Sequence, residues 1–168
     1  MNLHELLKER EAQGQPIRVG LIGSGRFGTM YLSQARNIPG VRVLAIADIN
    51  TARARESLAR VGWPEDAIVD SVDDLTEGKT AVIANAMDLF RTDIDVIVEA
   101  TGNPIVGIKH ALAAIDSGKH VMMVTVEADA LAGPALAKRA KDAGVVYSMA
   151  FGDQPALIWE LVDWARTS

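Results

Sequence analysis

The sequence predicts a single α/β domain built on a parallel sheet, and three observations predict it. Short apolar runs recur along the chain, they are continuous rather than alternating, and segments with helix start and stop signals lie between them. Continuous apolar runs are typical of parallel strands that are covered on both faces. Strands that alternate with helices imply right-handed crossovers. The expected strands are residues 17–23, 41–48, 94–102, 120–126 and 145–150.

Two helices between these strands carry clear boundary signals. Asn103 suits an N-cap, Pro104 the first helical position and Gly118 a left-handed C-terminal residue. Pro134 and Gly144 bracket a second helix in the same manner. The apolar stripe expected on the first helix is Ile105, Ile108, Leu112 and Ile115.

Two further regions are less regular. Residues 62–93 contain polar turns around short strands expected at 67–69 and 81–84. At the N-terminus, Leu3, Leu6 and Leu7 share one face of a short amphipathic helix.

Composition excludes several classes of protein. The 168 residues suffice for one well-buried core, and the net charge of -5 disfavours a nucleic-acid-binding protein. The absence of cysteine excludes disulfides, thiolate metal sites and cysteine nucleophiles. Neither a signal peptide nor a membrane span is recognisable. We therefore expect a cytoplasmic protein without a metal and without nucleic-acid or membrane partners.

The stretch "IRVGLIGSGRFGTMYL" carries the main functional signal. Its glycines are spaced G-x-G-x-x-G, directly after a strand and at the start of a helix, and Asp48 follows about 20 residues after Gly28. This combination is typical of a dinucleotide-binding turn in a Rossmann-type doubly wound sheet. Gly23 would permit the tight turn, Gly25 the approach of a pyrophosphate, and Gly28 close helix packing. The alternative is a strand-to-helix turn without a ligand.

The charges near this turn bear on the cofactor. Phosphates would lie at the helix N-terminus, where Arg26 adds a cation. Asp48 can accept hydrogen bonds from both adenosine ribose hydroxyls and would repel a 2′-phosphate, which favours NAD. If Asp48 turned away, Arg53 and Arg55 could pair with a phosphate, so NADP remains an alternative, as does a solvated helix face. We expect NADH to bind more tightly than NADPH.

The rest of the site is expected after the later strands, because ligands of open parallel sheets lie outside the carboxyl ends of the strands. Thr101 and Gly102 permit close approach of a nicotinamide ribose, and Thr125, Glu127 and Asp129 follow the next strand. Glu127 is a candidate acid or base for the proton that accompanies hydride transfer. Its alternative role, which Asp129 fits better, is that of a carboxylate complementing a helix dipole.

Three segments, "GLIGSGRFG", "VIVEATGNP" and "GKHVMMVTVEADALAG", carry a resemblance that covers nearly all of residues 15–165. They resemble the nucleotide-binding half of homoserine dehydrogenase-like oxidoreductases, in a bacterial branch that includes a reductoisomerase-like enzyme acting on deoxyxylulose phosphate. Homoserine dehydrogenases carry an Asn-Lys pair, its lysine linked to catalysis, where this chain has Glu127 and Ala128. The resemblance implies diphosphate contacts from Gly23, Gly25, Phe27 and Gly28, an adenosine ribose contact from Asp48, and nicotinamide ribose contacts from Ala100, Thr101 and Gly102.

The C-terminal stretch completes the prediction. A helix starting at Asp153 or Gln154 would present a broad apolar face, which favours self-association or docking to a further segment. We expect a helical extension at 1–14, a dinucleotide-binding domain at 15–150 and, at 151–168, a helix leading to an absent substrate domain. In this hypothesis the chain holds the cofactor of an oxidoreductase acting on a small polar substrate and turns over little alone. The alternative is a stand-alone NAD(P)(H)-sensing regulatory module.

Overall fold

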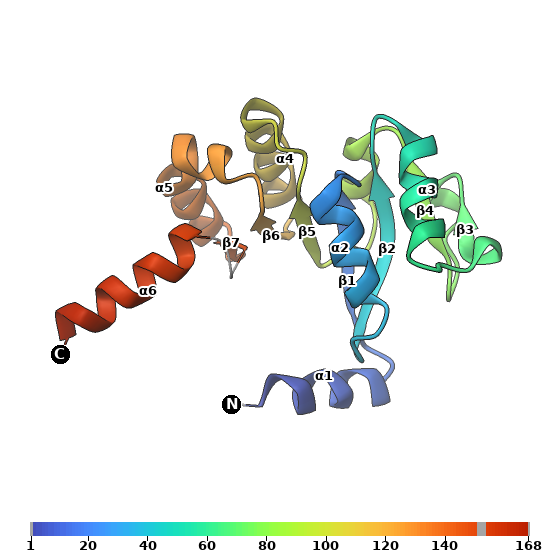
Figure 1. The fold of residues 1–168 in the computed structure, drawn as a ribbon, viewed down its shortest axis with the longest axis horizontal. Coiled ribbons are helices and arrows are strands. Elements are labelled where there is room, and N and C mark those ends of the chain that lie inside the picture. The colour runs from blue at the N-terminus through green and yellow to red at the C-terminus, as the bar shows by residue number, and fades with distance from the viewer. Residues whose placement is uncertain (1, 151–153, 168) are drawn as a thin grey trace.

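A computed structural model describes residues 2–150 and 154–167, and it confirms the Rossmann-type doubly wound sheet (Figure 1). Seven strands pair in the order β3-β4-β2-β1-β5-β6-β7, and every pair is parallel. The order reverses at β1, whose neighbours are β2 and β5. The strands are β1 (Ile17–Ile22), β2 (Val41–Ala47), β3 (Ile68–Val69), β4 (Thr80–Ile83), β5 (Val96–Glu99), β6 (His120–Met123) and β7 (Tyr147–Met149).

Helices cover the two faces of the sheet, as right-handed crossovers require. On one face α2 and α3 bury Leu32 and Leu58 against Leu21. On the other, α4 and α5 bury Ala111 and Leu136. The described helices are α1 (Leu3–Ala12), α2 (Arg26–Ala35), α3 (Thr51–Arg60), α4 (Pro104–Asp116), α5 (Val126–Asp142) and α6 (Gln154–Thr167), with 3-10 turns η1 (Glu65–Ala67), η2 (Val72–Asp74) and η3 (Ala86–Arg91).

Helix α4 has the expected ends, and most of its expected apolar stripe packs on the core. Asn103 Oδ1 accepts a hydrogen bond from the Val106 N–H at 3.1 Å, and Gly118 has a φ of 72°. However, Ile105 in the expected apolar stripe is 56% exposed. Ile115 is fully buried, and Ile108 and Leu112 are partly buried against the core, so only the first position of the expected stripe is exposed. Small residues beside the stripe let the helix lie close to the sheet. The buried residues are Gly107, His110, Ala111, Ala114 and Ile115.

Helix α5 begins earlier than the sequence signals indicated. It starts at Val126, so Pro134 lies inside the helix rather than at its beginning, while Gly144 follows its end with a φ of 73°. Proline removes one intrahelical hydrogen bond. Burial of Ala128 before it and of Leu136 and Ala140 after it ties both parts of the helix to the sheet and outweighs that loss.

The two terminal helices lie outside the layered body (Figure 1). Helix α1 buries no side chain and lies beyond the amino ends of the strands. Helix α6 extends away from the sheet, and the expected start at Asp153 falls outside the described residues. No helix in the described ranges is long and apolar enough to cross a membrane.

Candidate dinucleotide site

The glycine loop packs tightly against the loop that follows β5. Gly23 has a φ of 97°, and a Cβ atom there would lie 2.5 Å from the Ala100 carbonyl oxygen. A Cβ atom on Gly28 would lie 2.3 Å from the Gly23 carbonyl oxygen. Side chains at these two positions would therefore force apart the first turn of α2, the glycine loop and β5. The close packing of these backbone segments therefore requires glycine at both positions.

Gly25 differs, because apart from its two chain neighbours no described residue has an atom within 4 Å of the position its Cβ would take. Its φ of -66° suits any residue, and it forms the N-cap of α2 without a side-chain hydrogen bond to the first turn. The N–H groups at the start of a helix lack partners within the helix. Open space beside such N–H groups is the arrangement that admits a phosphate.

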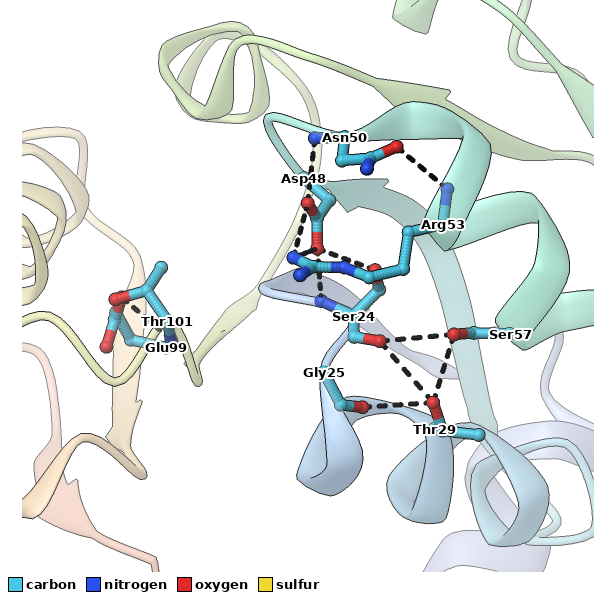
Figure 2. A network of polar contacts seen from close by, with 9 residues as sticks. All are labelled: Ser24, Gly25, Thr29, Asp48, Asn50, Arg53, Ser57, Glu99 and Thr101. Carbon is cyan, nitrogen blue, oxygen red and sulfur yellow. Dashed lines mark hydrogen bonds and ion pairs between the residues drawn. The ribbon is translucent and has the colours of Figure 1, made fainter.

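Hydroxyl groups fasten the glycine loop to the two helices on its face (Figure 2). Thr29 Oγ1 donates to the Gly25 carbonyl at 2.9 Å, and Ser57 Oγ donates to the Ser24 carbonyl at 3.1 Å. The two hydroxyls also lie 3.0 Å apart in a hydrogen bond. The loop is thus held in shape by the protein itself. Phe27 is half-buried and stacks on Tyr31, with ring centroids 6.4 Å apart.

Asp48 follows β2, and its side chain is only 2% exposed. Oδ2 accepts hydrogen bonds from the Ser24 N–H at 2.8 Å and the Ser24 hydroxyl at 2.6 Å, while Oδ1 accepts from the Asn50 N–H at 2.9 Å. Arg53 Nη2 lies 2.8 Å from both oxygens. Burial raises the pKa of Asp48, but these hydrogen bonds outweigh it and lower the pKa to about 2.

These contacts bear on the expected ribose contact. The Asp48 carboxylate turns toward Ser24, and Arg53, whose side chain is 52% exposed, pairs with it. Arg55 lies with Asp70, its Nη2 2.5 Å from Oδ1, and so does not join this cluster. Arg53 also lines a groove of about 650 Å³ between α2 and α3, together with Arg26. Of the partners of Asp48, only the Arg53 guanidinium belongs to an exposed side chain that can swing into solvent.

A second buried carboxylate lies at the end of β5, apart from the Asp48 cluster (Figure 2). Glu99 is 0% exposed, and its Oε1 accepts a hydrogen bond from the Thr101 hydroxyl at 2.6 Å. Thr125 donates its hydroxyl to Oε2 and accepts a hydrogen bond from the Gly102 N–H at 3.0 Å. His110 Nδ1 lies 3.4 Å from Oε1. Thr101, Gly102 and Thr125 are thus brought together.

Glu127 lies apart from this network. It is exposed at the second position of α5, and within the described part of the chain its carboxylate has no hydrogen-bond or ion-pair partner. Asp129 accepts a hydrogen bond from the Tyr147 hydroxyl at 2.8 Å. Burial raises the pKa of Tyr147, and Asp129 raises it further. Asp129 therefore has a structural partner, whereas Glu127 is free to meet a ligand.

Sequence reasoning missed a surface beyond β4. Ile49, directly after Asp48, is 93% exposed. A cavity of about 400 Å³ lies between the start of α3, which follows Ile49 in the sequence, and the segment after β4. Its lining includes Thr51, Ala84 and Asn85. The available signal was a large apolar side chain directly after the acidic residue of a glycine-loop motif, where a ligand could bury it.

Comparison with known proteins agrees with this geometry. The model of an oxidoreductase family with an NAD-binding Rossmann fold, Gfo/Idh/MocA, matches residues 17–151. A glycosyl hydrolase family 109 protein of Shewanella amazonensis is 32% identical over 115 residues, which make up 64% of this chain and 22% of that protein. The chain thus spans about a fifth of that curated relative.

Two solved structures are also similar. A homoserine dehydrogenase from Thiobacillus denitrificans is 25% identical with a TM-score of 0.64, over 80% of this chain and 29% of that one. A scyllo-inositol dehydrogenase from Lactobacillus casei, solved with bound NAD(H) and scyllo-inositol, is 19% identical with a TM-score of 0.62, over 90% of this chain and 42% of that one. The second likeness concerns the fold alone.

Proposed function

The chain belongs to the Gfo/Idh/MocA family of oxidoreductases with an NAD-binding Rossmann fold, and from this premise we propose that it holds and orients a nicotinamide dinucleotide for hydride transfer. The observation that carries the proposal is the open space beside Gly25 within an otherwise tightly packed loop. Gly23 and Gly28 are glycines because neighbouring backbone excludes a side chain. No contact among the described residues excludes a side chain at Gly25, and a ligand would explain why none is there.

The site residues follow from this assignment. Gly25, Arg26 and Phe27 at the start of α2 would hold the diphosphate, with Gly23 and Gly28 shaping the turn. Asp48 and Ile49 would face the adenosine, and the segment from Ala100 to Gly102, together with Thr125, would face the nicotinamide ribose. When bound, the cofactor supplies the hydride, and the protein supplies binding and orientation.

The adenosine ribose is expected to displace Arg53. In the structure the guanidinium occupies the outer side of the Asp48 carboxylate. A ribose diol would take its place, and the half-exposed arginine would turn into solvent. A 2′-phosphate would instead keep Arg53 as a partner but lie beside the Asp48 charge. We propose NAD as the preferred cofactor, in line with the family.

The substrate is proposed to be small and polar, and bound largely by residues outside this domain. Helix α6, within 151–168, would lead from the dinucleotide-binding domain at 15–150 to them, as in a homoserine dehydrogenase-like enzyme, and 1–14 would be an extension. The 25% identity with the homoserine dehydrogenase supports that branch. Glu127, exposed and without a partner in the described residues, is the proposed acid or base.

A second function is favoured by one observation, the exposed apolar side chains of α6. Ile158, Trp159 and Leu161 are each more than half exposed. Such a face suits contact with another protein. In this alternative the chain is a regulatory module that senses NAD(P)(H) and reports its binding through α6. A partner recovered only in the presence of NADH or NAD would support this alternative.

Calorimetric titration of the chain with NADH and NADPH tests the main proposal. We expect NADH to bind more tightly, because Asp48 would repel a 2′-phosphate. A preference for NADPH of about tenfold or more would overturn the assignment of Asp48. Robust dehydrogenase turnover by the 168-residue chain alone would contradict the division of labour between this domain and the rest of the enzyme.

A further inference from the structure

Glu99 is a fully buried carboxylate that the proposed function leaves without a role. It ends β5, where residue Ile22 of β1 pairs with it in register. Its side chain lies on the face covered by α4 and α5, and α4 has a glycine, Gly107, where it meets this side chain. A Cβ atom on Gly107 of α4 would lie 3.0 Å from Glu99 Oε2. Glycine at the fourth position of α4 thus leaves room for the carboxylate packed against it.

The shortest hydrogen bonds to Glu99 come from hydroxyl groups. Two threonine hydroxyls donate to it, one to each oxygen. Its contact with His110 is longer, at 3.4 Å. Burying a carboxylate is costly without several good hydrogen bonds. A residue kept at this cost, with a glycine accommodating it, calls for an explanation beyond filling the core.

Thr125 connects Glu99 to the ligand edge. It occupies the N-cap of α5, where a threonine hydroxyl ordinarily bonds to an N–H of the first turn. Here it makes no such bond. Its hydroxyl donates instead to Glu99 and accepts from the Gly102 N–H. The carboxylate thus fixes the direction of the Thr125 proton and, through it, the position of Gly102.

The segment held in this way adjoins the glycine loop. The Gly23 turn packs on the Ala100 carbonyl, and Thr101 is bound to Glu99 by its own hydroxyl. The segment lies on the opposite side of β1 from Asp48, at the reversal of strand order where ligands of open sheets bind. With the adenosine at Asp48, this side faces the nicotinamide half.

We propose that Glu99 is a positioning residue that sets the nicotinamide half of the site through Thr101 and Thr125. The inference rests on the proposed dinucleotide binding and deepens it. Glu99 touches no ligand itself. It holds two hydroxyls and one backbone N–H in the arrangement that the nicotinamide riboside meets, while the adenosine half is held independently by Ser24 and Asp48.

The test compares two ligands that differ in this half, NADH and ADP, on the intact chain. ADP carries the adenosine and diphosphate but no nicotinamide riboside. In Glu99→Gln, one side of the amide is a donor and faces a threonine hydroxyl that must then turn round. In Thr125→Val the hydroxyl is lost, whereas Thr125→Ser keeps it. Asp116→Asn, an exposed carboxylate at the end of α4 paired with Arg139, is the control.

We expect Glu99→Gln and Thr125→Val to weaken NADH binding about tenfold and to leave ADP binding within about twofold. Thr125→Ser and Asp116→Asn should resemble the parent chain with both ligands. A merely structural role would weaken both ligands together. Equal losses for NADH and ADP, or no loss for either, would overturn the inference. If the parent chain bound neither ligand, the proposed function itself would fall.

Discussion

Two carboxylates, Asp48 and Glu99, lie at the carboxyl ends of β2 and β5, the strands on either side of β1, and they have different partners. Asp48 and Glu99 are both buried, and each accepts hydrogen bonds from a hydroxyl group close by (Figure 2). Asp48 also carries a cation, the half-exposed guanidinium of Arg53. Glu99 lies among two threonines and His110, with no arginine or lysine among its partners in the described residues.

Because of this difference, a ligand could displace one partner of Asp48, whereas the partners of Glu99 stay in place. Arg53 lies on the first turn of α3, and rotation of its side chain would expose one side of the Asp48 carboxylate to a ligand. The hydroxyl donors to Glu99 lie on the short side chains of Thr101, in the loop after β5, and Thr125, at the start of α5, and these cannot swing away into solvent as the long Arg53 side chain can. We therefore regard the Asp48 cluster as a ligand contact and the Glu99 cluster as a support.

The different roles given to the Asp48 and Glu99 clusters require a dinucleotide that lies between them. Gly25→Val is the substitution expected to weaken binding of that dinucleotide most. The φ of -66° and the open space at this position leave room for a side chain in the protein without a ligand. A valine would fill the space proposed for the diphosphate. We expect NADH affinity to fall about 100-fold or more, which is about 2.7 kcal/mol of binding free energy. The melting temperature should change little.

Calorimetry and a thermal melt measure the two quantities. Ala59→Val, on the exposed part of α3, serves as a control for adding a β-branched residue to this face. Gly28→Val is a useful contrast, since its Cβ would meet the Gly23 carbonyl and should lower stability as well as binding. Unchanged NADH affinity in Gly25→Val would refute the proposed diphosphate site.

Arg53→Ala sharpens the distinction between the clusters. Removing the guanidinium leaves Asp48 open to a ribose diol and removes the cation that could receive a 2′-phosphate. We expect NADH to bind as tightly as in the parent chain or slightly more tightly, and NADPH to bind about tenfold more weakly. Titration with both nucleotides gives the ratio. Arg55→Ala, whose guanidinium pairs with Asp70, is the matched control and should leave the ratio unchanged. A loss of NADH affinity in Arg53→Ala would show that the arginine is itself a ligand contact.

The sequence predicted the fold and the glycine turn next to Asp48 better than the cluster of contacts around Glu99, for a physical reason. Parallel strands and a glycine turn leave local patterns: apolar runs, a fixed glycine spacing and an acidic residue after the next strand. Even the short strands β3 and β4 lie where residues 67–69 and 81–84 were expected. The boundaries were less accurate, because the apolar runs extended past the paired residues, as at Val96–Glu99 within 94–102.

The Glu99 cluster joins residues 99, 101, 110 and 125, which no single motif spans. Its partners meet only once β5, α4 and α5 pack together. The available hint was an acidic residue at the end of an apolar strand followed eight positions later by Gly107. The pairing of Arg53 with Asp48 was likewise invisible, because side-chain direction is decided by competition among hydrogen bonds rather than by spacing.

The smallest expected effect concerns acid stability, where Asp48 should act as a structural group as well as a ligand contact. Its pKa in the folded chain is about 2, below the ordinary 3.8. A lowered pKa means that the ionised carboxylate stabilises the fold above the ordinary value, and that this stability is lost as the pH falls through the folded value. The shift would be worth about 2 kcal/mol if unscreened, and the exposed Arg53 partner reduces it to about 1 kcal/mol.

Urea unfolding between about pH 5 and pH 2 should therefore show a shallower loss of stability in Asp48→Asn than in the parent chain. Asp116→Asn, at an exposed ion pair, is the control and should keep the parental slope. An unchanged slope in Asp48→Asn would mean that the bonds from Ser24, Asn50 and Arg53 do not hold the carboxylate in solution, and Asp48 would then be free to meet the ribose without displacing the arginine.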